Sequence, residues 1–114
     1  MSERAAPRIA LGVLMFLLPA AAVAGDAGAP AAFYAAECAF CHGAAGAGDG
    51  PAGAMLTPRP TSFASAAYWK SADRKALAKV IAEGRAGTAM MAFSSKLSAP
   101  QIDALVTHLE SFAK

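Results

Sequence analysis

The clearest hydrophobic pattern lies near the C-terminal end, where apolar residues recur at the spacing of one helix face. They stand at offsets 0, 3, 4, 7 and 10: Ile102, Leu105, Val106, Leu109 and Phe112. Ser98 and Gln101 have the spacing of a capping box, and Pro100 is tolerated in a first helical turn. The pattern therefore predicts an amphipathic helix over residues 99–112.

Two further segments also have helical character. Residues 72–83 follow Ser71, a good N-cap, and precede Gly84, which stands where a C-terminal cap belongs. One face of this helix carries Leu77, Val80, Ile81 and Gly84. Residues 31–41 are rich in alanine and contain neither glycine nor proline, which predicts another helix.

The segments between these helices are long and irregular. The first long loop begins with the glycine-rich residues 43–53 and continues through residues 57–60, where every second residue is proline. Residues 85–97 form the second long loop. Loops of this length are unusual in a small domain unless they wrap around something. We find no alternation typical of strands and no internal repeat, so we expect an all-α fold.

The N-terminal segment has the pattern of a secretory signal peptide. Arg4 and Arg8 precede an apolar run over residues 9–18, and small residues at 22–24 form a cleavage site. We expect residues 1–24 to be removed and residues 25–114 to be a single periplasmic domain. The alternative is a retained anchor, and we expect membrane association only in that case.

Charge and size narrow the class of protein. The whole chain has a formal charge of +2, and residues 25–114 carry eight Lys and Arg against seven Asp and Glu. No basic face is evident, which argues against nucleic-acid binding. A domain of about 90 residues is marginal on apolar burial alone, and its two closely spaced cysteines offer little as a disulfide. This shortage points to a prosthetic group.

The sequence Cys38-Ala39-Phe40-Cys41-His42 is the attachment motif of c-type haem. Two thiols three positions apart on a helical turn reach the two vinyl groups at one haem edge, and the next residue then projects over the porphyrin to ligate iron. A thioredoxin-like site would need a βαβ pattern, and a structural zinc site would want four ligands. We therefore expect one covalent haem c, held by both cysteines, with the histidine as an iron ligand.

Beyond this motif, the chain resembles class I c-type cytochromes over nearly all of residues 25–114. The matching residues are Phe33-Tyr34, the Cys-x-x-Cys-His-Gly run at 38–43, Gly-Asp-Gly-Pro at 48–51, and residues 87–93 before the last helix. The resemblance implies three to five short helices around one haem, with the N- and C-terminal helices packed together. It also implies electron transfer between redox partner proteins.

The resemblance also implies a methionine as the second axial ligand. Members of the family often read Met-Pro-Ala-Phe where this chain has Met90-Met91-Ala92-Phe93. By that match Met90 is the ligand and Met91 replaces a proline. Either thioether suits haem iron, so Met91 and, more remotely, Met55 remain alternatives. A methionine that does not bind iron is expected to fill space in the core.

Further roles follow from the same resemblance. Pro51 is expected to offer its carbonyl oxygen to the second ring nitrogen of the histidine ligand, which would fix the orientation of the ring. Arg59 and Trp69, together with Tyr68, are candidate donors to the haem propionates. His108 lies beside the apolar stripe of the last helix, where a half-buried or exposed site is expected rather than iron ligation.

Residues 48–53 formally fit the pattern GxGxxG. They follow no strand and open no helix, which excludes a dinucleotide site. We expect these glycines instead to let the backbone approach the haem face.

The sequence thus predicts a one-electron carrier rather than an enzyme, with no small-molecule substrate. One alternative is a tightly bound haem subunit of a periplasmic dehydrogenase or oxidase. Another is a haem sensor or enzyme whose sixth ligand is displaceable.

Overall fold

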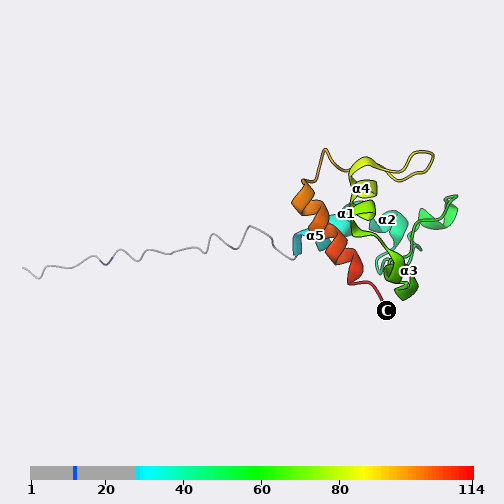
Figure 1. Cartoon of the computed structure of the whole chain (residues 1–114), viewed down its shortest axis with the longest axis horizontal. Helices are drawn as coiled ribbons and strands as arrows, with labels where there is room; N and C mark the ends of the chain where they lie inside the picture. Colours follow the sequence, from blue (N-terminus) through cyan, green and yellow to red (C-terminus); the bar gives the residue numbers. More distant parts are fainter. Residues whose placement is uncertain (1–11, 13–27) are drawn as a thin grey trace, which may run out of the picture.

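The computed structural model describes residue 12 and residues 28–114. The expected signal segment and its cleavage site therefore lie outside the described residues, apart from residue 12. The described part contains five α-helices, one short 3-10 helix and no strand (Figure 1). They are α1 (Gly28–Glu37), α2 (Ala39–His42), η2 (Gly53–Met55), α3 (Ala66–Ser71), α4 (Arg74–Glu83) and α5 (Ala99–Glu110). The predicted all-α fold is confirmed. Within this part of the chain, no helix is both long and apolar enough to span a membrane.

The last helix, α5, begins as the sequence predicts. The Ser98 hydroxyl accepts from the backbone N–H of Gln101 at 3.3 Å, and the Gln101 side chain accepts from the Ser98 N–H at 2.8 Å. Its apolar stripe is buried from Ile102 to Leu109. The helix ends at Glu110, two residues earlier than predicted, and Phe112 lies beyond it, with its ring centroid 4.9 Å from that of Tyr34 in α1.

Helix α5 packs against both α1 and α4 (Figure 1). The prediction that the first and last helices of the domain pack together is therefore confirmed.

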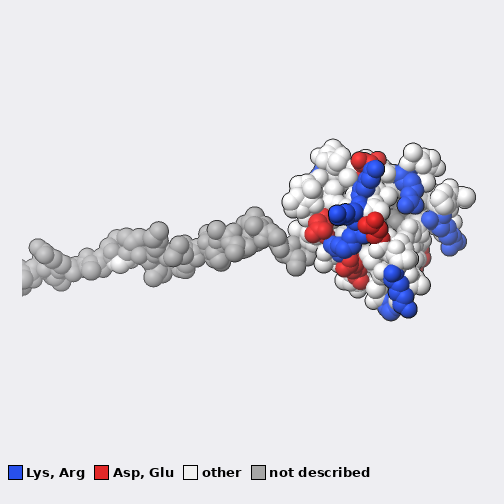
Figure 2. Space-filling model, in the orientation of Figure 1, with Lys and Arg blue, Asp and Glu red and all other residues white. Residues whose placement is uncertain are grey.

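Polar contacts also join α4 to α5. Arg74 at the start of α4 pairs with Glu110, and it also lies 3.2 Å from Asp103 Oδ1 and 3.1 Å from Thr107 Oγ1. These groups are largely exposed, so water screens the pairing and its contribution to stability is modest. Basic and acidic side chains are interspersed on the face seen in Figure 2.

Two other predicted helices also have boundaries that differ from the structure. The helix expected over residues 72–83 starts only at Arg74, because Asp73 rather than Ser71 caps it. The Asp73 carboxylate accepts from two backbone N–H groups of the first turn, and Ala72 is extended. Ser71 instead ends the preceding helix α3, which the sequence did not predict. A six-residue helix is too short to display a hydrophobic period.

The helix expected over residues 31–41 is also divided. Helix α1 ends at Glu37 and α2 begins at Ala39, with Cys38 as the residue between them. The hydrogen bonds nevertheless continue through the junction, because Cys38 N–H donates to Tyr34 O at 2.9 Å and His42 N–H donates to Cys38 O at 2.9 Å. The helical hydrogen bonding is therefore kept through Cys38, although the two helices are separate elements.

Among the residues that the structure describes, the buried core contains eight side chains. They are Tyr34, Phe63, Ile81, Phe93, Ile102, Leu105, Val106 and Leu109. All of these except Ile102 and Val106 also line a large cavity, which makes six of the eight part of its wall. The helices therefore enclose a space rather than pack directly on a common centre.

One buried hydrogen bond joins α1 to the turn that follows α2. The Tyr34 hydroxyl donates to the carbonyl oxygen of Gly43 at 2.6 Å, and the tyrosine is only 2% exposed. Burial, with smaller effects of Cys38 and Asp49, raises the pKa of Tyr34 to about 12.

We predict that Tyr34→Phe lowers the free energy of unfolding by about 1 kcal/mol at neutral pH, because Gly43 O loses a buried donor. In the unfolded chain the phenol ionises near pH ~10, below its pKa of about 12 in the folded chain. The contribution of the neutral phenol is therefore complete below the unfolded pKa and is lost as the pH rises towards 12. Denaturant unfolding of both proteins between neutral and alkaline pH measures this, and an unchanged difference across that range would contradict it.

Candidate functional site

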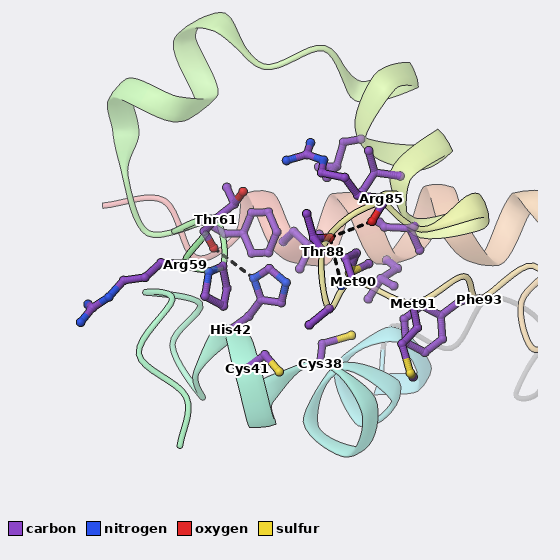
Figure 3. A pocket seen from close by; sticks show the side chains of 18 of the residues that line it. Cys38, Cys41, His42, Arg59, Thr61, Arg85, Thr88, Met90, Met91 and Phe93 are labelled. Carbon is purple, nitrogen blue, oxygen red and sulfur yellow. Dashed lines mark hydrogen bonds between the residues drawn. The ribbon is translucent and has the colours of Figure 1, made fainter. Parts of the chain in front are cut away.

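The cavity has a volume of about 530 Å³ and lies between α2, α4, α5 and the two long loops (Figure 3). This volume falls within the usual range of cofactor and ligand sites, roughly 300–1,000 Å³. Most of its deep wall is apolar, and it includes Phe63, Leu77, Val80, Ile81, Leu105 and Leu109. Polar side chains such as Arg59, Asp73 and Arg85 also line it and remain exposed to solvent.

The haem-attachment motif forms one wall of this cavity. Cys38, Cys41 and His42 all line it, because α2 and its N-cap residue Cys38 turn the three side chains to the same side (Figure 3). Neither cysteine is in a disulfide, and both are half-buried. Burial, followed by the charges of Glu37 and Cys41, raises the pKa of Cys38 to about 11. This thiol is therefore protonated at neutral pH, unlike the reactive thiolate of a redox CxxC site.

The ring of His42 is held by a backbone carbonyl. Its Nδ1 atom lies 3.0 Å from Thr61 O, and because a carbonyl oxygen only accepts, Nδ1 carries the proton. The ring also stacks on Phe63, with centroids 4.9 Å apart. Burial lowers the pKa of His42, although the bond to Thr61 opposes this. The neutral ring therefore keeps the lone pair of Nε2 available to a metal.

The expected hydrogen bond from the His42 ring to the carbonyl oxygen of Pro51 is wrong. Thr61 takes that role, and Pro51 is an exposed turn residue that does not line the cavity. Sequence reasoning missed Thr61 because any residue can supply a backbone carbonyl, so no side-chain motif marks the position. A backbone bond from Phe63 N–H to Gly46 O at 2.6 Å ties the segment after Thr61 to the glycine-rich loop.

The glycines of residues 48–53 have a different role from the one expected. A Cβ atom on Gly50 would collide with the carbonyl oxygens of Ala39 and Phe40, and one on Gly53 would collide with that of Cys41. Glycine therefore lets this loop pack against the carbonyl end of α2, not against the haem face. The contact is fixed by Gly50 N–H donating to Cys41 O at 3.1 Å.

Two methionines of the second long loop line the cavity, but they differ in exposure. Met90 is half-buried and packs against the core, whereas Met91 is 57% exposed. In Figure 3 Met91 lies beside Phe93 and its sulfur points away from the ring of His42. Met55 is 86% exposed and does not line the cavity, so it does not fill space in the core as expected.

The other candidate residues are divided between the cavity and the rest of the fold. Trp69 does not line the cavity, and its indole N–H already donates to Phe63 O at 2.7 Å, so its expected propionate role is wrong. Tyr68 and Arg59 do line the cavity. The Arg59 guanidinium points outward in Figure 3, and its role towards a propionate stays a prediction. His108 is half-buried beside Tyr34 and Phe112, away from the large cavity.

The residues present fit a covalently attached haem. Two free thiols one turn apart, a neutral imidazole with a free ring nitrogen and a half-buried thioether all line one apolar cavity of cofactor size. Soft sulfur and imidazole nitrogen are the ligands that haem iron takes in electron-transfer proteins.

Comparison with solved structures supports the fold. The chain is 26% identical to "KustC0563 c-type cytochrome", with a TM-score of 0.58 over 75% of this chain and 98% of the other. The fold is also similar to "c-type cytochrome NirC", at 21% identity and a TM-score of 0.57 over 75% of this chain and 91% of the other.

A third similar structure is larger. It is a chain of the "Kuenenia stuttgartiensis reducing HAO-like protein complex Kustc0457/Kustc0458", with 24% identity and a TM-score of 0.62. The similarity covers 74% of this chain but 41% of that one, so this fold forms less than half of that neighbour. No curated protein sequence matches the chain.

The family comparison covers most of the chain. A family model described as "Cytochrome C oxidase, cbb3-type, subunit III" matches residues 25–109, which include the attachment motif, both long loops and nearly all of α5. Together with the cavity and the similar cytochromes, this match shows that the protein binds haem c covalently and carries electrons rather than acting as an enzyme. The chain belongs to this family of cytochrome c domains and is a monohaem c-type cytochrome of class I.

Proposed function

We propose that the protein is a periplasmic one-electron carrier with His42 and Met90 as axial iron ligands and Cys38 and Cys41 as the thioether attachment points. It would exchange electrons with redox partner proteins of the cell envelope. The observation that carries this proposal is the position of Met90, half-buried on the wall of the same apolar cavity that His42 lines.

The two proposed ligands have different supports. His42 is held by Thr61 O and by stacking on Phe63, so its ring is oriented before a metal binds. Such a carbonyl partner also makes the imidazole a better donor to a metal. Met90 is favoured over Met91 because it packs against the core, whereas the Met91 side chain is mostly in solvent.

When bound, haem supplies a reversible one-electron couple at its iron, and methionine ligation raises the potential of that couple. The protein's part is to hold the two ligands in place and to keep water away. Phe63, Ile81 and Leu105 form a buried apolar wall behind the ligands. A rigid, dry surrounding changes little between the two charge states, which favours fast electron transfer.

A second candidate function is a permanent haem subunit of a larger enzyme. The matching family is described as an oxidase subunit, and one similar structure belongs to a complex. Phe40, between the two cysteines, is 66% exposed, and Met91 is 57% exposed, so apolar side chains lie in solvent near the attachment motif. Gel filtration of the protein purified from its native host distinguishes the two, because a free carrier elutes at its own mass.

We predict that the protein produced with a haem-attachment system has the mass of the polypeptide plus one haem and stays coloured on a denaturing gel. Cys38→Ala with Cys41→Ala should abolish the coloured band, because no thioether remains. Each single variant should keep one bond and give a less stable holoprotein. Wild-type protein with the bare polypeptide mass would contradict the proposal.

We also predict that Met90→Ala removes the methionine-to-iron charge-transfer band of the oxidised protein and lowers the reduction potential. The decrease in reduction potential should be a substantial part of the roughly 0.8 V range over which axial ligands set haem potentials. Optical spectroscopy and potentiometry measure both effects.

Two methionines of the same chain are matched controls for this variant. Met55→Ala changes an exposed side chain outside the cavity and should leave the band and the potential unchanged. Met91→Ala should also keep the band. If the charge-transfer band disappeared in Met91→Ala and remained in Met90→Ala, the ligand would be Met91.

A further inference from the structure

We propose that Thr88 is a positioning residue for Met90, and that its hydroxyl keeps the loop closed so that the thioether stays on the cavity wall. This inference rests on the proposed ligation by Met90. It comes from two hydrogen bonds that converge on a single hydroxyl two residues before the methionine.

The hydroxyl of Thr88 is used as both donor and acceptor. It donates to the carbonyl oxygen of Arg85 at 2.8 Å, and it accepts from the backbone N–H of Met90 at 3.2 Å (Figure 3). The same side chain therefore connects the first and last residues of the turn. A hydroxyl is needed, because neither a methyl group nor a thiol would serve both partners well.

The rest of the loop is anchored at the C-terminal end of α4. Phe93 N–H donates to Ile81 O at 2.9 Å, and Ser94 N–H donates to Ala82 O at 3.1 Å. Between the end of α4 and Phe93, the turn of residues 85–90 is closed by two backbone hydrogen bonds. Arg85 N–H donates to Met90 O and Thr88 N–H donates to Arg85 O, both at 3.2 Å. Both bonds lie at the upper end of the usual range, as does the bond from Met90 N–H to the Thr88 hydroxyl. The 2.8 Å bond from that hydroxyl to Arg85 O is therefore the shortest hydrogen bond that closes the turn.

The Thr88 hydroxyl is expected to act on an equilibrium between a closed loop, with Met90 on the cavity wall, and an open loop, with Met90 displaced from it. A hydrogen bond present only in the closed form favours that form, and its loss raises the open fraction. An external ligand such as imidazole binds iron only when Met90 has left it, so its apparent affinity increases with the open fraction. Loss of both bonds of one hydroxyl should therefore be visible as tighter imidazole binding.

The experiment titrates oxidised holoprotein with imidazole and follows the loss of the methionine-to-iron band. We expect Thr88→Val, which keeps the shape of the side chain but not its hydroxyl, to bind imidazole about tenfold more tightly than wild type. Thr88→Ser keeps the hydroxyl and should bind within about twofold of wild type. The denaturing haem stain checks that each variant carries its haem.

Thr107→Val is the matched control. It also removes a threonine hydroxyl that bonds an arginine and a backbone carbonyl, but it lies on α5 outside the cavity. It should lower stability without changing imidazole affinity. Equal tightening in Thr107→Val, or in Thr88→Ser, would overturn the proposal, because the effect would then not belong to the Thr88 hydroxyl.

The Met90→Ala variant separates this inference from the proposed ligation. If Met90→Ala keeps the band, the ligation by Met90 is wrong and the role of Thr88 fails with it. If Met90→Ala loses the band and Thr88→Val binds imidazole as wild type does, the ligation stands and only the role of Thr88 is overturned.

Discussion

The turn of residues 38–42 must present two thiols and an imidazole to the same side, and the surrounding structure is built to hold that turn. The Tyr34 hydroxyl in α1 donates a hydrogen bond to the carbonyl of Gly43, directly after this turn. Gly50 and Gly53 approach the carbonyl groups of the turn so closely that no larger residue fits. From inside the cavity, Phe63 supports the imidazole ring. Helices α4 and α5 then enclose the space that these three side chains face.

Sequence reasoning identified the parts of the fold that repeat a strong pattern. The apolar stripe and capping box of α5 are specific enough to predict a helix. The motif from Cys38 to His42 is specific enough to predict its chemistry. It failed where the pattern was short or absent. Helix α3 is too brief to show a period, and the competition between Ser71 and Asp73 for the cap depends on the extended backbone of Ala72.

The errors at the site share a physical cause. Thr61 and Phe63 both use backbone carbonyls, one towards His42 and the other towards the Trp69 indole, and backbone groups leave no trace in a sequence. The roles expected of Pro51 and Trp69 were assigned from side-chain identity and position along the chain. Only the folded arrangement reveals which carbonyl or donor is already used.

The placement of six core residues on the cavity wall has a consequence for the life of the chain before maturation. A polypeptide whose largest apolar side chains surround a space for a cofactor has few direct contacts with which to hold itself together alone. Until the attachment reaction is complete, such a chain is expected to unfold more readily, and proteases act on unfolded segments.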